Sequence, residues 1–272
     1  TDSAYLNFVD VCKKLKITAD KDYLNFVNIF TKKHLTPFLE ERFSYFSKGL
    51  HNISKNYFDL KRESVCTGAI FVQKKKYALY SIDDEGVTYA APKLKIKGME
   101  IVRSSTPSFC REKIKEIVEL IFKENNKEGI INRIRELKKE FKKQNLMNIA
   151  FPRNVKDLDA YIDSSGKLDK GTPIHVRASR NYNELLKKMG LQDKYEPVYN
   201  ADKIRFIYLL PDNYLRENII AFKGEFPKEF NLLKYIDYDT QFEKSFMSPV
   251  RTICEAMNWA INLDESDLNE FF

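Results

Sequence analysis

Residues 64–97 read SVCTGAIFVQKKKYALYSIDDEGVTYAAPKLKIK, and this stretch predicts a small antiparallel sheet. It contains two runs rich in β-formers, 64–72 and 76–82, and then the turn sequence of residues 83–86, after which 87–90 returns as the partner strand of a hairpin. The last five residues of the stretch alternate lysine with apolar side chains, which predicts a strand with one basic face.

Helical patterns flank this sheet on both sides. Before it, residues 20–60 carry apolar side chains at helical spacing, with Pro37 at the start of a second helix. After it, Ser104-Ser105-Thr106-Pro107 predicts a helix start, with a hydroxyl at the N-cap and proline at the first helical position. The helix that follows and a second one, at about 128–145, each carry one apolar stripe, which predicts a helical hairpin.

The two ends of the chain complete the predicted architecture. Alternation of apolar and polar side chains at residues 4–9 predicts an opening strand, whereas residues 151–175 are rich in loop-forming sequence. Residues 204–210 predict a buried strand, and short helices are expected over much of 228–261. Strands therefore precede most of the helices, with a break near Arg103, and this order predicts an α+β fold in two units.

Composition restricts the kinds of protein that this chain can be. Of its 272 residues, 43% are hydrophobic and 31% are charged, which is typical of a globular chain. No apolar run approaches the roughly 18 residues that span a bilayer, so no membrane partner is expected. The four cysteines lie far apart in sequence, which disfavours a zinc site and predicts reduced thiols in a cytoplasm. The net charge of +7, concentrated in the middle of the chain, favours a polyanionic partner, although the lysine-rich composition that an AT-rich genome encodes would give the same excess.

Three local features are candidates for nucleic-acid contact. Lys74-Lys75-Lys76-Tyr77 is expected to begin a strand, with Lys74 and Lys76 on one face and Lys75 and Tyr77 on the other. The helix start at 104–107 could bind phosphate through amides and hydroxyls, although capping alone would explain it. His175-Val176-Arg177, with Tyr182 beyond, follows a Gly-Thr-Pro turn at a helix entry, and arginine suits bidentate phosphate contact.

The order and spacing of these features match one family. The opening Thr1-Asp2-Ser3 resembles the end of motif C of family B DNA polymerases, and Lys74-Lys75-Lys76-Tyr77 resembles the basic-basic-x-Tyr motif of their palm. Residues 91–107 resemble the crossing from palm to thumb in the polymerases of T-even-like bacteriophages. His175-x-Arg177 with Tyr182 is similar to a primer-phosphate contact segment of that thumb. The resemblance extends through the acidic and aromatic C-terminal tail and covers essentially the whole chain.

The resemblance implies a role for each matching residue. Asp2 would be a catalytic, metal-binding carboxylate, with two magnesium ions in the assembled enzyme. Lys75 would contact the primer-terminal base pair, Lys74 with Tyr77 would help hold the duplex, and Asp83 sits where the family also has an acid. The phosphate-binding residues of the thumb would be Ser105, Thr106, His175, Arg177 and Tyr182. The hydrophobic plug that inserts into a sliding clamp would be Leu268, Phe271 and Phe272.

The implied organisation is the C-terminal part of the palm at 1–103, a mainly helical thumb at 104–262 and a clamp-binding tail at 263–272. The implied function is the C-terminal portion of a DNA-directed DNA polymerase that replicates a phage genome in the cytoplasm of the infected bacterial host. Its partners would be primer-template DNA, a sliding clamp and an N-terminal polymerase fragment. Two-metal chemistry needs further carboxylates, so the chain alone is expected to be inactive.

Two questions stay open in the sequence. A non-catalytic DNA-binding or clamp-interacting accessory derived from a polymerase thumb would carry the same motifs. A chain that starts on Thr1 also implies an upstream segment, which protein splicing, a split gene or trimming would each explain. The nucleotides upstream of Thr1 would distinguish these three origins.

Overall fold

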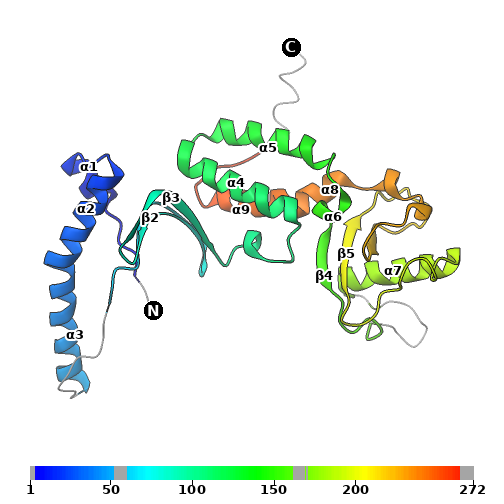
Figure 1. Ribbon diagram of the computed structural model, residues 1–272, viewed down its shortest axis with the longest axis horizontal. Coiled ribbons are helices and arrows are strands. Elements are labelled where there is room, and N and C mark those ends of the chain that lie inside the picture. The colour runs from blue at the N-terminus through cyan, green and yellow to red at the C-terminus, as the bar shows by residue number, and fades with distance from the viewer. Residues whose placement is uncertain (1–3, 52–59, 162–168, 170, 264–272) are drawn as a thin grey trace, which may run out of the picture. The chain divides into compact units, whose positions relative to one another are not determined.

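The computed structural model describes residues 4–51, 60–161, 169 and 171–263 (Figure 1). Helices and two small antiparallel sheets alternate along the chain, so the predicted α+β class is confirmed. The chain divides into two compact units, Thr1–Ile70 with Ala78–Ile96 and Phe71–Tyr77 with Lys97–Phe272. In the part of the chain that the structure describes, no helix has both the length and the apolar character that crossing a bilayer requires.

The first unit begins with helices rather than with the predicted strand. Residues 4–8 have no regular structure, and helix α1 covers Val9–Leu15. The side chain of Asn7 accepts the backbone N–H of Val9 at 2.9 Å, so this local bond starts a helix where the alternation of side chains suggested an extended strand. Phe8 instead packs edge-on against Phe26 and Phe30 of the next helix.

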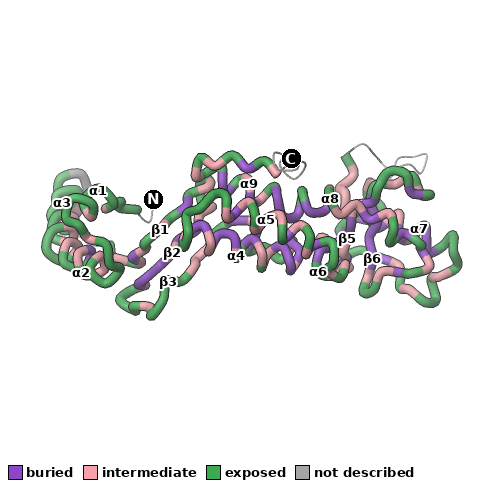
Figure 2. Tube along the Cα trace, turned by 90° about the horizontal axis from the view of Figure 1, so that it is seen from above, coloured by how far each residue is buried: buried purple, intermediate pink, exposed green. Residues whose placement is uncertain are grey.

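The predicted helices over 20–60 are present as far as the structure describes them. Helix α2 covers Asp20–Phe30, a π-helical turn η1 covers Thr31–Leu35, and α3 covers Thr36–His51. Pro37 lies in the first turn of α3, as predicted, and proline lacks the N–H that would continue a regular α-helical ladder through this point. Much of the surface of α1–α3 is exposed (Figure 2).

The first sheet has the strand order β1-β2-β3, with β1 at Ser64–Gln73, β2 at Lys76–Asp84 and β3 at Val87–Lys97. The second hairpin turn consists of Glu85 and Gly86, with φ of 50° and 89°, as in the type I′ turns that match strand twist. Asp83 and Asp84 therefore belong to β2, and the sequence analysis was wrong to place them in the turn.

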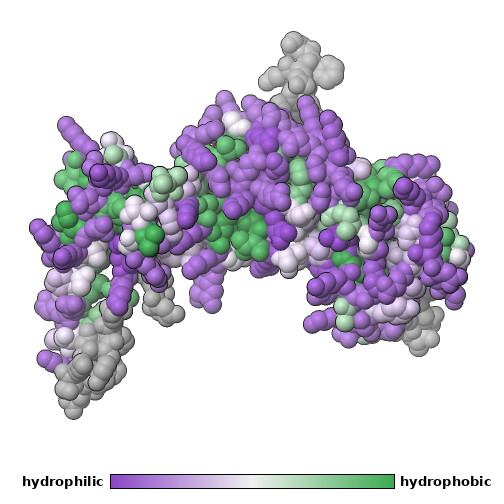
Figure 3. All heavy atoms as spheres, viewed as in Figure 1, coloured by the Kyte–Doolittle hydropathy of each residue, from purple (hydrophilic) through white to green (hydrophobic). Residues whose placement is uncertain are grey.

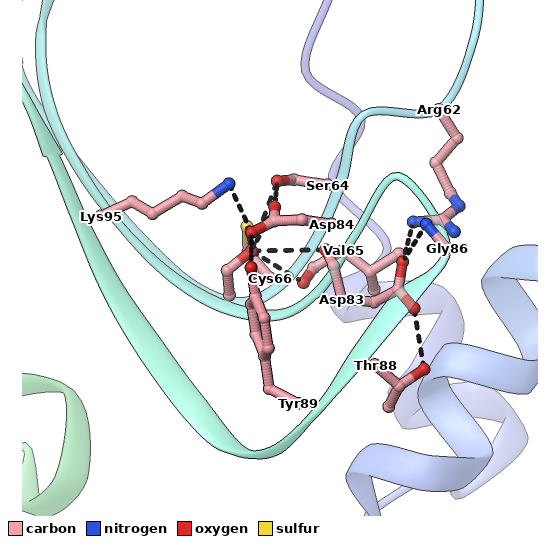
Figure 4. A network of polar contacts seen from close by, with 11 residues as sticks. Arg62, Ser64, Val65, Cys66, Asp83, Asp84, Gly86, Thr88, Tyr89 and Lys95 are labelled. Carbon is pink, nitrogen blue, oxygen red and sulfur yellow. Dashed lines mark hydrogen bonds and ion pairs between the residues drawn. The ribbon is translucent and has the colours of Figure 1, made fainter.

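These two neighbouring carboxylates organise the polar interior of the first sheet (Figure 4). Because adjacent strand residues point to opposite faces, Asp83 and Asp84 have separate partners. The Asp83 carboxylate accepts hydrogen bonds from the Arg62 guanidinium at 2.6 Å, the Thr88 hydroxyl at 2.8 Å and the Gly86 amide at 3.1 Å. Burial alone would favour the neutral acid, but the bonds from Thr88 and Arg62 hold the pKa of Asp83 below its ordinary value of 3.8.

Asp84 joins all three strands of the sheet. Its carboxylate binds the ammonium of Lys95 on β3 at 2.5 Å and accepts a hydrogen bond from the Tyr89 hydroxyl at 2.5 Å. On the other side it accepts from the Ser81 hydroxyl at 3.1 Å and from the hydroxyl of Ser64 on β1. Burial opposes ionisation here too, yet Lys95 and Ser64 keep the pKa of Asp84 far below its ordinary value.

The second unit contains the predicted helical hairpin. Helix α4 covers Ser108–Glu124 and α5 covers Lys127–Phe141, joined at Asn125, which adopts the left-handed conformation (φ 46°). The predicted apolar stripes of both helices are buried, which confirms the helical pattern: Ile114, Ile117, Val118 and Ile121 on α4, and Ile130, Ile134, Leu137 and Phe141 on α5. Helix α5 ends earlier than the predicted residue 145.

A second sheet lies in the same unit, and most of it was not predicted. Strand β4 covers Phe151–Asn154, β5 covers Lys203–Tyr208 and β6 covers Ile219–Phe222, in the order β4-β5-β6. The register pairs Arg153 with Ile204 and Tyr208 with Ile219. Only β5 was foreseen, within 204–210, because strands of four residues are too short to show a periodic pattern.

The remaining elements pack around this sheet. Helix α7, Ile174–Met189, packs against β6 and β5, and the short helix α6, Leu146–Ile149, precedes β4. The short helices predicted over 228–261 are present. Two 3₁₀ turns cover Lys228–Phe230 and Leu233–Tyr235. Helix α8 covers Tyr238–Phe242 and α9 covers Ser248–Glu255, with a π-helical turn at Glu243–Met247 between them. Buried positions are concentrated along α4, α5, β5 and β6 (Figure 2).

We expect the Asp83→Asn substitution to lower the free energy of unfolding by about 2 kcal/mol at pH 7, because it leaves the half-buried Arg62 without a carboxylate partner. Since the folded pKa of Asp83 is depressed, its stabilisation is complete above pH 3.8 and is lost as pH falls through the folded value. Urea titrations at pH 7 and pH 3 measure both effects.

The exposed Asp22→Asn is the matched control, with an expected change within about 0.5 kcal/mol at pH 7. Equal losses for the two variants would show that the carboxylate of Asp83 is not specially stabilising.

Candidate nucleic-acid interface

The lysine-rich motif forms a turn, not the start of a strand. Lys74 and Lys75 connect β1 to β2, and Lys75 has a φ of 65°, so the predicted alternation of faces does not apply to them. Both side chains are exposed. Lys76 begins β2 and its ammonium lies 3.1 Å from the Glu100 carboxylate, whereas Tyr77 is half-buried with its ring 5.9 Å from that of Phe71. The turn therefore presents two lysines together to solvent.

The helix start after the first sheet differs by one residue from its prediction. Pro107 occupies the N-cap position and α4 begins at Ser108, with no side-chain cap. The hydroxyl of Thr106 instead donates to the Glu100 carbonyl at 2.7 Å, and Thr106 is only 6% exposed. Ser105 is half-buried, and its carbonyl accepts a hydrogen bond from a distant arginine.

That arginine, Arg153 on β4, connects the helix start to the second sheet. Its guanidinium donates to the Ser105 carbonyl at 2.6 Å and to the Pro152 carbonyl at 2.9 Å, and it lies 5.8 Å from the ring centroid of Phe151. Phe151 stacks on Phe206 of β5, so a pair of stacked phenylalanine rings supports the guanidinium. Burial lowers the pKa of Arg153, although a guanidinium stays charged at neutral pH.

His175 and Arg177 lie in the first turns of α7, close to Arg153. Burial, and then the positive charge of Arg153, lower the pKa of His175 below 6.5, so its imidazole is neutral at pH 7. The Arg177 guanidinium donates to the side-chain carbonyl of Asn218 at 2.8 Å. Burial raises the pKa of Tyr208, and the charges of Arg177 and Arg153 act against this rise.

These mutual effects place five residues in one neighbourhood, which we call the arginine cluster: Ser105, Arg153, His175, Arg177 and Tyr208. Its two guanidinium groups bind oxygens of carbonyl groups, and neither forms an ion pair with a carboxylate within the described residues. The Nε of Arg177 is buried and has no hydrogen-bond partner among them. Two cations without a carboxylate partner favour an anion such as phosphate.

Sequence reasoning found three members of the arginine cluster and missed Arg153 and Tyr208. Arg153 lay in a stretch predicted to be loop, and nothing in the sequence pairs it with α7. Tyr208 was included in a predicted strand, but its neighbours depend on the register with β6. The sequence signal that could have indicated Arg153 is a cation directly after the aromatic-proline pair Phe151-Pro152.

Tyr182 lies away from the arginine cluster, in the interior of the second unit. It is fully buried, its ring is 5.8 Å from that of Phe230, and its hydroxyl donates to the Glu196 carbonyl at 3.4 Å. Burial raises its pKa to about 12. Its observed environment is that of a core residue that fixes α7, so a direct phosphate contact does not follow from this geometry.

The remaining predicted residues are either engaged elsewhere or outside the described part. Asp83 is bound within the first sheet. Asp2 and the proposed clamp plug, Leu268, Phe271 and Phe272, lie outside the described residues. Within the described residues no three metal-binding side chains gather, so the magnesium prediction depends on Asp2.

Comparison with known proteins identifies the family. The family model for DNA polymerase family B matches residues 29–257. The chain is similar to two curated relatives over 94% of its length, the DNA-directed DNA polymerase of Enterobacteria phage T4 (28% identity over 271 residues) and that of Escherichia phage RB69 (27% over 272 residues). It spans 29% of the length of each relative. Because the match covers most of the chain, and agrees with the motifs in its sequence, this chain belongs to DNA polymerase family B.

Proposed function

We propose that this chain is the C-terminal portion of a phage replicative DNA polymerase, and that its own task is to hold the primer-template duplex behind the site of synthesis in the cytoplasm of the infected host. The observation that carries the proposal is the arginine cluster, in which Arg153 and Arg177 donate to neutral oxygens and have no acidic partner among the described residues. Family membership makes a DNA backbone the natural anion.

The two basic groups would serve different parts of the duplex. In the arginine cluster the guanidinium groups would donate to phosphate oxygens, and neutral His175 would add a hydrogen bond rather than a charge. In the turn, Lys74 and Lys75 extend into solvent, where flexible ammonium groups suit the duplex near the primer end. Such contacts position DNA without reading its sequence.

The reaction itself would require more than this chain. Asp2 would supply one carboxylate to two magnesium ions, which would stabilise the attacking and leaving oxygens of nucleotidyl transfer. An N-terminal fragment would have to supply the other carboxylates, the fingers and the exonuclease. The role of Asp2 is therefore to complete a metal site that spans both fragments.

The first unit supports the proposal of an N-terminal partner. Large apolar side chains are exposed along α1–α3, among them Leu15 (55% exposed), Phe38 (51%) and Tyr45 (73%). Figure 3 shows apolar atoms gathered over the region of α1 and α2. Helix α1 contains no buried residue. A surface of this kind is typical of an interface, and we assign it to the N-terminal polymerase fragment.

The C-terminal tail would add a third partner. Its last nine residues contain four acids and no lysine or arginine, and Leu268 precedes Phe271 by three residues, which would put both on one side of a helical turn. A short apolar motif of this kind is suited to a hydrophobic pocket. We propose that this pocket belongs to a sliding clamp.

Arg177→Ala should weaken duplex binding by the chain at every DNA sequence tested and reduce the slope of log K against log salt by about one unit. The reason is that each phosphate contact releases about 0.9 counterion from the duplex. Fluorescence anisotropy with a labelled duplex across a salt series measures this slope.

Lys188→Ala provides the control, because Lys188 is at the other end of α7 and pairs with Glu184. We expect its slope to equal that of the unmodified chain. A slope unchanged by Arg177→Ala would mean that the arginine cluster does not bind phosphate.

The chain alone should incorporate no nucleotide, whereas adding the N-terminal fragment should restore primer extension with magnesium. In the restored enzyme, Asp2→Ala should abolish extension and leave duplex affinity within about twofold, since a metal ligand serves the transition state rather than duplex binding. Primer-extension gels and anisotropy on the same preparations provide the two measurements.

Incorporation by the chain alone would contradict the proposed division of labour. If no N-terminal fragment restored extension although the duplex was bound, the chain would instead be a DNA-binding accessory derived from a polymerase thumb.

Deleting residues 266–272 should leave extension by a single nucleotide intact and remove the gain in product length that a sliding clamp gives. The deleted segment contains Leu268, Phe271 and Phe272, which would fill the clamp pocket. Product lengths on a primed circular template, with and without clamp, provide the comparison. Equal clamp-dependent lengths for the deleted and complete chains would refute the assignment of the tail.

A further inference from the structure

The backbone of Gly98 lies directly against the turn that carries Lys75. A Cβ atom at position 98 would lie 2.0 Å from the carbonyl oxygen of Lys75 and 3.0 Å from its carbonyl carbon. Both neighbours are backbone atoms, so rotating a side chain could not relieve the overlap. Gly98 also has a φ of 69°, where an L-residue is strained. Any other residue at this position would therefore displace the turn.

Lys75 itself has a backbone conformation that lysine seldom adopts. Its φ of 65° lies in the left-handed region, which is strained for a residue with a Cβ. Glycine or asparagine would adopt this conformation more easily, yet a lysine occupies it. Such a conformation persists when its surroundings hold it in place. Lys75 is part of the two-residue turn between β1 and β2, and the backbone of Gly98 lies against it here.

The segment after Gly98 is itself firmly anchored. Met99 and Ile101 are buried, at 4% and 5% exposure. The Glu100 carboxylate pairs with Lys76, the residue that follows the turn, at 3.1 Å. The backbone carbonyl of Glu100 accepts a hydrogen bond from the Thr106 hydroxyl at 2.7 Å. Residues 98–101 therefore form a fixed support for the turn.

We propose that Gly98 is a positioning residue for duplex binding: its lack of a side chain lets the support at 98–101 hold the Lys75 turn in the one backbone conformation that directs its lysines to the DNA. The inference rests on the proposed function, because Lys75 must contact DNA for its position to matter. Gly98 itself would touch no DNA. Its effect on affinity should therefore pass entirely through the turn.

Gly98→Ala, Lys75→Ala and the double variant form the test, with duplex affinity measured across a salt series. Gly98→Ala should reduce the slope of log K against log salt by about one unit, as Lys75→Ala does. In the double variant the slope should fall no further than in Lys75→Ala alone. A purely structural role would give a loss of stability without this coupling.

Gly224→Ala is the matched control. Gly224 has nearly the same φ, 70°, but nothing lies within 4 Å of a Cβ placed there. The Gly224→Ala variant should therefore have a similar backbone strain and leave the slope of log K against log salt unchanged. Thermal unfolding of each variant measures how much of any loss comes from stability.

The outcomes separate the inference from the proposed function. If Lys75→Ala leaves the slope unchanged, the turn does not contact duplex phosphates and the proposed function of the turn fails. If Lys75→Ala lowers the slope but Gly98→Ala behaves like Gly224→Ala, Gly98 does not position the turn. Equal additional losses from Gly98→Ala in both backgrounds would also overturn the inference.

Discussion

The register of the first sheet depends on the two carboxylates at the end of β2. Asp83 and Asp84 point to opposite faces, and each face supplies its own complete set of donors. A slip of β2 that moved Asp83 to the place of Asp84 would bring Ile82 to face Arg62, which would lose its carboxylate partner. The cost of leaving buried charges unpaired makes the observed register the stable one.

The segment from Gly98 to Thr106 contacts both groups of basic residues that we assign to DNA. At its start the backbone of Gly98 lies against the Lys75 turn. Near its end the Ser105 carbonyl accepts a hydrogen bond from the guanidinium of Arg153 in the second sheet. The two basic groups are thus both connected to residues 98–106, one through the close backbone approach of Gly98 and the other through the hydrogen bond from the Arg153 side chain to Ser105. Rigid support of this kind lowers the entropy lost when a charged surface binds a regular polymer.

Sequence alone predicted the long elements and the chemistry of single residues, but not the short-range geometry between them. Helices α4 and α5 follow from their apolar stripes, because burial of such a stripe dominates helix stability. The opening strand failed because one side-chain bond from Asn7 starts a helix, and the strand alternation at the lysines failed because Lys75 has a positive φ. Arg153 was missed because β4 is defined by pairing with a distant strand, which no local pattern records.

The charges of the second unit show why net charge is a poor guide to the interface. Several of its cations are neutralised locally: Arg133 binds three glutamates, and Lys223 binds Glu196 and Asp202. Such paired cations contribute little field beyond their partners at physiological salt. Arg153 and Arg177 are instead held by neutral oxygens, so their charge remains available to an external anion. Attraction for a polyanion therefore depends on which cations lack a carboxylate, and that depends on the fold.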